Sequence, residues 1–183
     1  KYRRNTEGMD VIEAIHKRKS VRNFSGRQVE KEKLMRLLRA GQQAPSVRNG
    51  QPWMYVVIRK KDTLEKLAQI KKSWNPLRQA PAGICIFIDK NRYSSKHLEY
   101  FAQDCGAASE NILLAAVQEG LGGVWLGTYP DRDACEKVKI LLGLPDRMIP
   151  FNLIALGYPS ESDGVKPARK ELAVFYEKYD KAE

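Results

Sequence analysis

The chain of 183 residues has few of the residues that mark several large classes of protein. Its three cysteines, Cys85, Cys105 and Cys135, are odd in number and form no Cys-x-x-Cys pair, which argues against a disulfide framework and favours a reducing cytoplasm. With two histidines, His16 and His97, and no cluster of cysteine and histidine, a metal site is not expected. No apolar run approaches the roughly 20 residues of a membrane span.

Common signatures of nucleotide binding and nucleophilic catalysis are also missing. The chain has no Gly-x-x-x-x-Gly-Lys-Ser/Thr phosphate loop. Gly120 and Gly122 begin a Gly-x-Gly pattern, but Trp125 stands where a Rossmann turn needs its third glycine. Cys105 and His97 make a poor nucleophile and base, because Cys105 lies in an apolar helical pattern where cysteines are usually inert.

The formal net charge of +10 has three readings. Most lysine pairs, such as Lys60-Lys61 and Lys71-Lys72, are typical of a solvated surface. The excess could instead serve a nucleic-acid partner, or form a basin that attracts anionic cofactors and substrates. Because the cations are spread along the chain without an RNA-binding or helix-turn-helix motif, nucleic acid is the least favoured reading.

Apolar periodicity predicts an alternating α/β chain forming one domain over residues 9–183. Residues 1–8 are expected to be a flexible arm or an expression remnant, and they lack the apolar core of a secretory signal. The continuous apolar run Gly83–Asp89 predicts a strand covered on both faces. The other predicted elements are strands at 53–58 and 151–156 and helices at 30–42, at 63–71 capped by Asp62, at 104–119, from Asp131 or Asp133 to Leu142, and at 171–179.

A basic segment follows the short apolar stretch at residues 11–15. It places Arg18, Lys19, Ser20 and Arg22 within five residues. Phosphate binding calls for this chemistry, since arginine can engage two oxygens at once and serine adds a small hydroxyl. Alone, the segment is more often an ordinary solvated basic run at a helix end, because basic runs are common.

Three segments, taken together, resemble a known family. The first is Arg18-Lys19-Ser20-Val21-Arg22-Asn23-Phe24, the second runs Ala44-Pro45-Ser46-Val47-Arg48-Asn49-Gly50-Gln51-Pro52-Trp53, and the third runs Gly120-Leu121-Gly122-Gly123-Val124-Trp125-Leu126-Gly127. In this order and spacing they resemble the nitroreductase family of FMN-dependent oxidoreductases, from about Met9 to about Tyr179.

The resemblance implies both a fold and an activity. The expected fold is α+β, a central, mostly antiparallel sheet flanked by helices, completed by dimerisation with FMN at each subunit interface. The expected enzyme is a cytoplasmic homodimer that takes electrons from NAD(P)H. It would reduce a small nitroaromatic, quinone or similar conjugated acceptor by a ping-pong hydride transfer through flavin N5, without a catalytic acid or base from the protein.

The resemblance also implies cofactor-binding positions. Arg18, Lys19 and Ser20 would hold the phosphate and ribityl chain of FMN, with Arg22 near the pyrimidine edge, where a cation stabilises the reduced flavin. The remaining expected positions are Pro45, Ser46, Asn49 and Gln51 from the partner subunit, the backbone of Trp125, Leu126 and Gly127 near N5, and Arg169 with Lys166 or Lys170 at the phosphate.

A purely structural interpretation stays open for several of these expected site residues. The 45–51 segment could be a polar turn, with Trp53 as a packing anchor, and Gly120 could end a helix before a strand. Asn75 is the nearest candidate for contact with the flavin carbonyls, but its spacing departs from the family pattern and it is left outside the predicted site. Alternative functions are other flavin chemistry (dehalogenase, dehydrogenase or oxidase), a non-catalytic FMN-binding protein, or a nucleic-acid-binding module.

Overall fold

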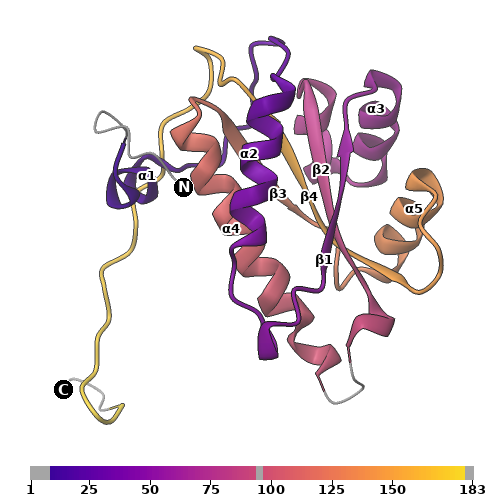
Figure 1. The fold of residues 1–183 in the computed structure, drawn as a ribbon. Helices are drawn as coiled ribbons and strands as arrows, with labels where there is room; N and C mark the ends of the chain where they lie inside the picture. The colour runs from indigo at the N-terminus through magenta and orange to yellow at the C-terminus, as the bar shows by residue number, and fades with distance from the viewer. Residues whose placement is uncertain (1–8, 94–96, 180–183) are drawn as a thin grey trace.

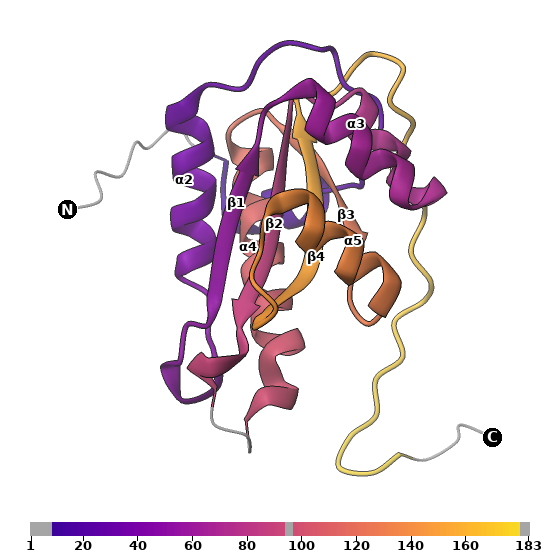
Figure 2. The same cartoon turned by 90° about the vertical axis from the view of Figure 1, so that its right-hand side faces the viewer.

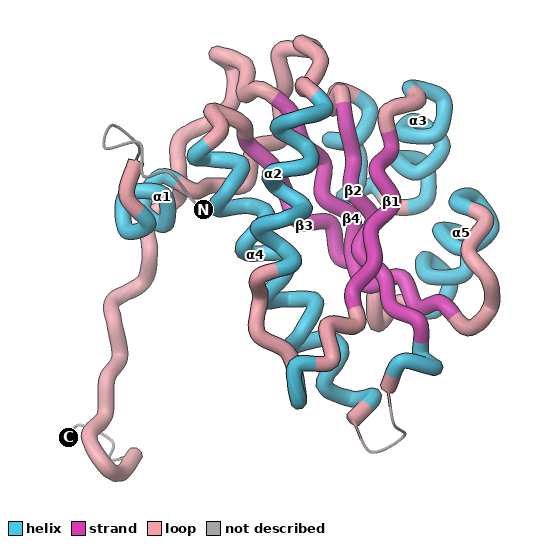
Figure 3. The backbone as a smooth tube through the Cα atoms, viewed as in Figure 1, coloured by secondary structure: helices cyan, strands magenta, loops and turns pink. Residues whose placement is uncertain are grey.

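The structure, a computed structural model, describes residues 9–93 and 97–179. Helices and strands alternate along the chain (Figures 1 and 3). The α-helices are α1 (Val11–Lys17), α2 (Lys31–Gln42), α3 (Lys61–Ile70), α4 (Phe101–Gln118) and α5 (Arg132–Leu142). The strands are β1 (Trp53–Ile58), β2 (Ala82–Asp89), β3 (Gly122–Gly127) and β4 (Met148–Gly157). Short 3-10 segments are η1 (Val47–Asn49), η2 (Lys72–Arg78), η3 (Lys90–Arg92) and η4 (Leu98–Tyr100).

The four strands form one antiparallel sheet in the order β1-β2-β4-β3. Both central strands are mostly apolar because helices cover both faces of the sheet (Figure 2); Asn152 of β4 is a buried polar exception, and β2 ends at Asp89. Ile84 and Ile86 of β2 pack into the core beneath α2 and α4, whereas Cys85 and Phe87 pack against α3, η2 and α5. The expected α+β fold with a central antiparallel sheet is confirmed.

Helix α4 is buried along one face, which contacts α2 and the sheet. Its other positions are partly buried or exposed, with Gln103, Glu110 and Gln118 on the exposed side. Among the described residues, no helix is both long enough and apolar enough to cross a membrane.

Several helix ends match the expected signals. The Asp131 carboxylate accepts a hydrogen bond from the backbone N–H of Ala134 at 3.0 Å, so Asp131 rather than Asp133 caps α5. Gly120 follows α4 with a φ of +71°, a left-handed conformation that favours glycine at a helix end. Trp53 is buried with 3% of its surface exposed, which confirms its packing role.

The predicted cap of α3 is wrong. Helix α3 begins at Lys61, and its N-cap Lys60 makes no side-chain capping bond. Asp62 therefore lies in the first turn, where it pairs with Lys66 at 2.7 Å. Its negative charge still suits the positive end of the helix dipole, although it caps no backbone group. Helix α4 also begins earlier than predicted, at Phe101.

The predicted terminal helix at 171–179 is also wrong. Residues 171–179 have no regular structure. They belong to the C-terminal segment, residues 163–179, which leaves the body of the molecule beyond α1 (Figures 1 and 2). Leu172, Phe175, Tyr176 and Tyr179 have helical spacing, but all four are exposed. A helix of nine residues is marginal in water unless it buries its apolar face, and the described part of this chain offers that face no surface.

Candidate functional site

A cavity of about 320 Å³ gathers the basic residues that the sequence singled out. We call it the phosphate cavity. Its lining comes from the segment after α1 and from the C-terminal segment, which are far apart in the sequence but adjacent in the fold. The residues that line it are Arg18, Lys19, Ser20, Arg22, Asn23, Asp163, Gly164, Val165, Lys166, Pro167 and Arg169. Five cations therefore face one carboxylate, and that donor set fits a phosphate. Lys170 does not line it.

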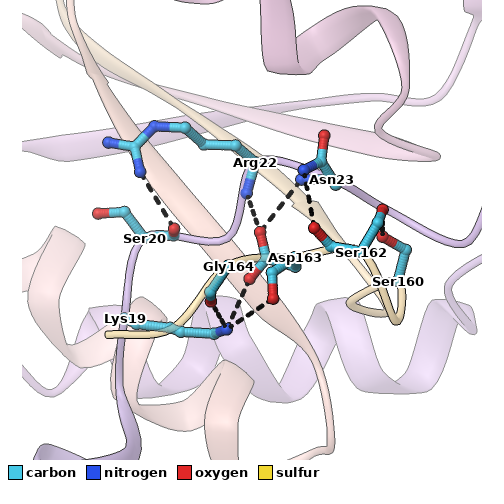
Figure 4. A network of polar contacts seen from close by, with 8 residues as sticks. All are labelled: Lys19, Ser20, Arg22, Asn23, Ser160, Ser162, Asp163 and Gly164. Atoms are coloured by element: carbon cyan, nitrogen blue, oxygen red, sulfur yellow. Dashed lines mark hydrogen bonds and ion pairs between the residues drawn. The ribbon is translucent and has the colours of Figure 1, made fainter. Parts of the chain in front are cut away.

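Asp163 joins the two sides of the phosphate cavity (Figure 4). Its Oδ1 accepts hydrogen bonds from the backbone N–H groups of Arg22 at 3.0 Å and Asn23 at 3.3 Å. Its Oδ2 pairs with Lys19 Nζ at 2.9 Å. Burial alone would raise the pKa of Asp163, but the bonds from Lys19 and the two backbone groups outweigh burial and hold the pKa below its ordinary 3.8.

The cations of the phosphate cavity do not play equal parts. Lys19 also donates to the backbone carbonyl of Gly164, and Lys166 Nζ donates to the carbonyl of His16 at 2.5 Å, at the end of α1. Both lysines therefore hold the C-terminal segment in place. Arg18 has only a loose pair with Glu110 at 3.4 Å, and Arg169 makes no ion pair or hydrogen bond with other described residues. The arginines are therefore freer to bind an anion.

The basic segment is anchored to the edge of the sheet. The backbone N–H of Val21 donates to the carbonyl of Gly123 at 3.1 Å, beside a bridge between Ser20 and Gly123. A Cβ on Gly122 would lie 2.3 Å from Cγ2 of Val21, so the contact requires glycine. The anchored Arg22 directs its guanidinium Nη1 to the Ser20 carbonyl at 3.3 Å.

A second cavity, of about 480 Å³, adjoins the first. We call it the ring cavity, because its lining includes the residues expected to lie near the flavin ring. It shares Arg22 and Asn23 with the phosphate cavity, so the two cavities are neighbours. Its other lining residues are Lys72, Ser73, Asn75, Pro76, Gln79, Val124, Trp125, Leu126 and Gly127. A Cβ at Gly127 would meet no other atom within 4 Å, so a ligand can approach the backbone there.

Three lining residues were missed from the sequence. The spacing of Asn75 departs from the family pattern, yet η2 places it in the ring cavity. Lys72 lies on the same 3-10 segment and lines the ring cavity, although its sequence pattern, a pair of adjacent lysines, is typical of a solvated surface. Nothing in the sequence indicates a role for Asp163, because its hydrogen-bond partners lie about 140 residues away in the chain.

The structure does not bring the 45–51 segment to either cavity. Pro45, Ser46, Asn49 and Gln51 lie between α2 and β1 and line neither cavity. The turn is strained, since Asn49 and Gln51 have φ values of +54° and +44°. Ser46 Oγ accepts the backbone N–H of Gln51 at 2.9 Å and holds the turn in shape.

Cys105 is poorly suited to act as a nucleophile. Cys105 is fully buried, and burial raises the pKa of its thiol, which leaves it unreactive. Among residues 9–93 and 97–179, no group of three or more His, Cys, Asp or Glu side chains could hold a metal ion.

Comparison with known proteins decides the family. The sequence model of the Nitroreductase family matches residues 15–83 and 71–158. The chain belongs to the nitroreductase family. This family member is accordingly an oxidoreductase, and the matched residues include the basic segment, η2 and the whole sheet.

Individual relatives support the same family assignment. A protein of Methanothermobacter thermautotrophicus, provisionally named NADH dehydrogenase/NAD(P)H nitroreductase, is 39% identical over 158 residues, which are 86% of this chain and 82% of that protein. The structure of a provisional NADH oxidase of Clostridium acetobutylicum superposes with a TM-score of 0.84 at 38% identity, over 93% of this chain and 100% of that one. The NADPH:FMN oxidoreductase of Vibrio harveyi, solved with NAD+, superposes with a TM-score of 0.81 at 27% identity, over 94% of this chain and 79% of that one.

Proposed function

We propose that residues 9–183 form one FMN-binding domain of an enzyme that takes electrons from NAD(P)H and passes them to a small conjugated acceptor. The cofactor is FMN, and NAD(P)H is the electron donor. One observation carries the proposal: the cationic phosphate cavity and the ring cavity adjoin each other and share Arg22 and Asn23. A phosphate, a polar linker and a ring system would meet the surface in that order.

The residues present fit FMN. In the phosphate cavity, Arg18 and Arg169 would bind the phosphate, Ser20 would donate its hydroxyl, and Lys19 and Lys166 would keep the segment in place. In the ring cavity, Arg22 would supply positive charge at the ring edge, and the backbone at Leu126 and Gly127 would approach the ring closely. Asn75 would join the hydrogen-bonding groups of this cavity.

The chemistry that FMN supplies when bound is the transfer of two electrons from NAD(P)H to an acceptor. The protein would bind and orient the reactants, and Arg22 would supply positive charge beside the ring edge. For a nitroaromatic acceptor the first stage is ArNO2 + NAD(P)H + H+ → ArNO + NAD(P)+ + H2O, and a quinone would instead be reduced to the quinol. Donor and acceptor would use the ring cavity in turn, which predicts ping-pong kinetics.

The proposed enzyme is a homodimer in which the partner subunit supplies Pro45, Ser46, Asn49 and Gln51. Their position in a preformed turn outside the two cavities supports a contribution to a second copy of the site. Apolar surface also supports dimerisation. Val11 and Ile12 of α1 are 65% and 58% exposed, and Leu172 and Tyr176 of the C-terminal segment are 84% and 80% exposed.

The visible absorption spectrum tests the proposal. The purified protein, loaded with FMN and gel-filtered, should keep a flavin spectrum that bleaches when NAD(P)H is added without oxygen. Protein that stays colourless after incubation with FMN would overturn the flavoenzyme reading. Yellow protein that does not bleach would keep FMN and exclude the nicotinamide donor. Analysis of products from nitro, quinone and halogenated acceptors would then separate reductase from dehalogenase chemistry.

A further inference from the structure

A third cavity extends the site on the side away from the phosphate cavity. We call this space, of about 550 Å³, the outer cavity; its lining is Ala68, Gln69, Lys72, Asn75 and Arg78. It shares Lys72 and Asn75 with the ring cavity and no residue with the phosphate cavity. The ring cavity therefore lies between the other two, and a ligand stacked in it could extend over η2 into the outer cavity.

The charged side chains that line the ring cavity and the outer cavity are all positive. Arg22 and Lys72 are the charged residues that line the ring cavity, Lys72 and Arg78 those that line the outer cavity, and neither lining includes Asp or Glu. A ligand with an acidic group would meet no like charge among these residues.

Lys72 differs from its cationic neighbours because its charge is uncompensated. Arg78 Nη1 pairs with Glu65 at 2.6 Å, and Lys71 Nζ pairs with Asp131 at 2.9 Å. Lys72 makes no ion pair or hydrogen bond with any other described residue, and it is exposed on η2. Its ammonium is thus the cation that an incoming ligand can engage without breaking a contact within the described chain.

We propose that Lys72 selects ligands that carry an anionic group, a carboxylate or phosphate, beyond the part that occupies the ring cavity. This inference rests on the proposed function, because it places the ligand beside bound FMN. The anion has two chemical sources. It is either the acid group of the electron acceptor or the additional phosphate by which NADPH differs from NADH, since donor and acceptor enter the same cavity in turn.

The test measures kcat/KM on the FMN-loaded enzyme with two matched pairs of substrates. The acceptor pair is 4-nitrobenzoate and 4-nitrobenzamide, which share a nitrobenzene body and differ in charge. The donor pair is NADPH and NADH. In each pair, kcat/KM for the more anionic substrate is divided by kcat/KM for its less charged partner. The ratio removes effects of a substitution on FMN content and on the chemical step.

Lys72→Met should lower at least one ratio by about two- to five-fold, the range of an exposed ion pair. A fall with the acceptor pair alone assigns the anion to the acceptor, and a fall with the donor pair alone assigns it to NADPH. Lys72→Arg should restore the ratio. The control is Lys60→Met, which removes the same charge beside α3 but lines none of the three cavities.

Salt separates a charge effect from a change in cavity shape. The preference of the wild type for the more anionic substrate of a pair should decrease when the ionic strength is raised from 0.01 to 1 M. The reason is that the Debye length falls from about 30 to about 3 Å. Unchanged ratios in FMN-dependent Lys72→Met, or equal falls in Lys60→Met, would overturn this inference alone. Absence of any FMN-dependent turnover in the wild type would overturn the proposed function and this inference with it.

Discussion

The side-chain amide of Gln42 donates to Oε1 of Gln51 at 2.9 Å, and its own Oε1 accepts the indole N–H of Trp53 at 3.0 Å. Because the indole can only donate, it fixes which way the Gln42 amide faces. Gln51 Nε2 then donates to Asn49 Oδ1 at 3.0 Å. The orientation of each of the three side-chain amides is therefore set by the hydrogen bond before it. The side-chain N–H donors of Asn49 are then available to the cofactor site of the second subunit to which we propose it contributes.

Replacing Gln42 by Glu should weaken FMN binding by a few-fold. The carboxylate can still accept from Trp53 but cannot donate to Gln51, so the orientation of the Gln51 and Asn49 amides is no longer set. Fluorescence titration of FMN measures the Kd. The matched control is Gln43→Glu, one residue further on, whose side chain makes no hydrogen bond with described residues. Equal Kd values for both variants would show that the amide series does not support the cofactor site.

Arg22→Ala should weaken FMN binding and lower the reduction potential of the bound flavin. A charged hydrogen bond contributes about 1.5–3 kcal/mol, which corresponds to roughly 30–60 mV for a two-electron couple. The potential is measured by reductive titration against a reference dye with saturating FMN. Arg132→Ala removes an equal charge at the start of α5, away from both cavities, and should leave the potential where it is. An unchanged potential in flavin-loaded Arg22→Ala would reject the role given to Arg22.

Asp163→Asn should remove part of the acid dependence of folding stability. The folded pKa of Asp163 lies below its ordinary 3.8, so its contribution is complete above pH 3.8 and is lost as the pH falls through the folded value. At pH 7 the variant should lose about 1–3 kcal/mol, because Lys19 and two backbone N–H groups lose a charged partner. Urea unfolding at pH 7, 4.5 and 3 measures the free energy.

The control for that experiment is Glu161→Gln, an exposed carboxylate two residues earlier. The difference in unfolding free energy between wild type and Asp163→Asn should narrow from pH 4.5 to pH 3, whereas Glu161→Gln should follow the wild type throughout. A gap that stays constant with pH would show that Asp163 acts through shape rather than charge.

Two glycines of β3 should respond differently to alanine. At Gly122 a new Cβ would lie 2.3 Å from Val21, so Gly122→Ala should destabilise the fold and loosen the basic segment. At Gly127 the space is open, so Gly127→Ala should keep the unfolding free energy within about 0.5 kcal/mol yet weaken FMN binding. Thermal unfolding of the apoprotein and FMN titration separate the two effects. FMN affinity unchanged in Gly127→Ala would place the ring elsewhere.

Much of the fold follows from local pattern. The continuous apolar runs of β1 and β2 and the Asp131 cap of α5 depend on neighbours in the sequence, so they could be predicted without a structure. The 171–179 helix failed for the opposite reason: its periodicity is real, but a short helix needs a surface to bury its apolar face, and sequence does not reveal whether one is present.

The residue types of the site and the family that they resemble can be read from the sequence, because the phosphate-binding chemistry of arginine and serine belongs to the side chains themselves. Which side chains lie together became known only from the folded structure. It joined Asp163 to Lys19, placed Asn75 and Lys72 along the ring cavity, and kept Asn49 outside it. Such contacts depend on how β3, η2 and the C-terminal segment pack, and packing is a property of the whole chain rather than of any local pattern.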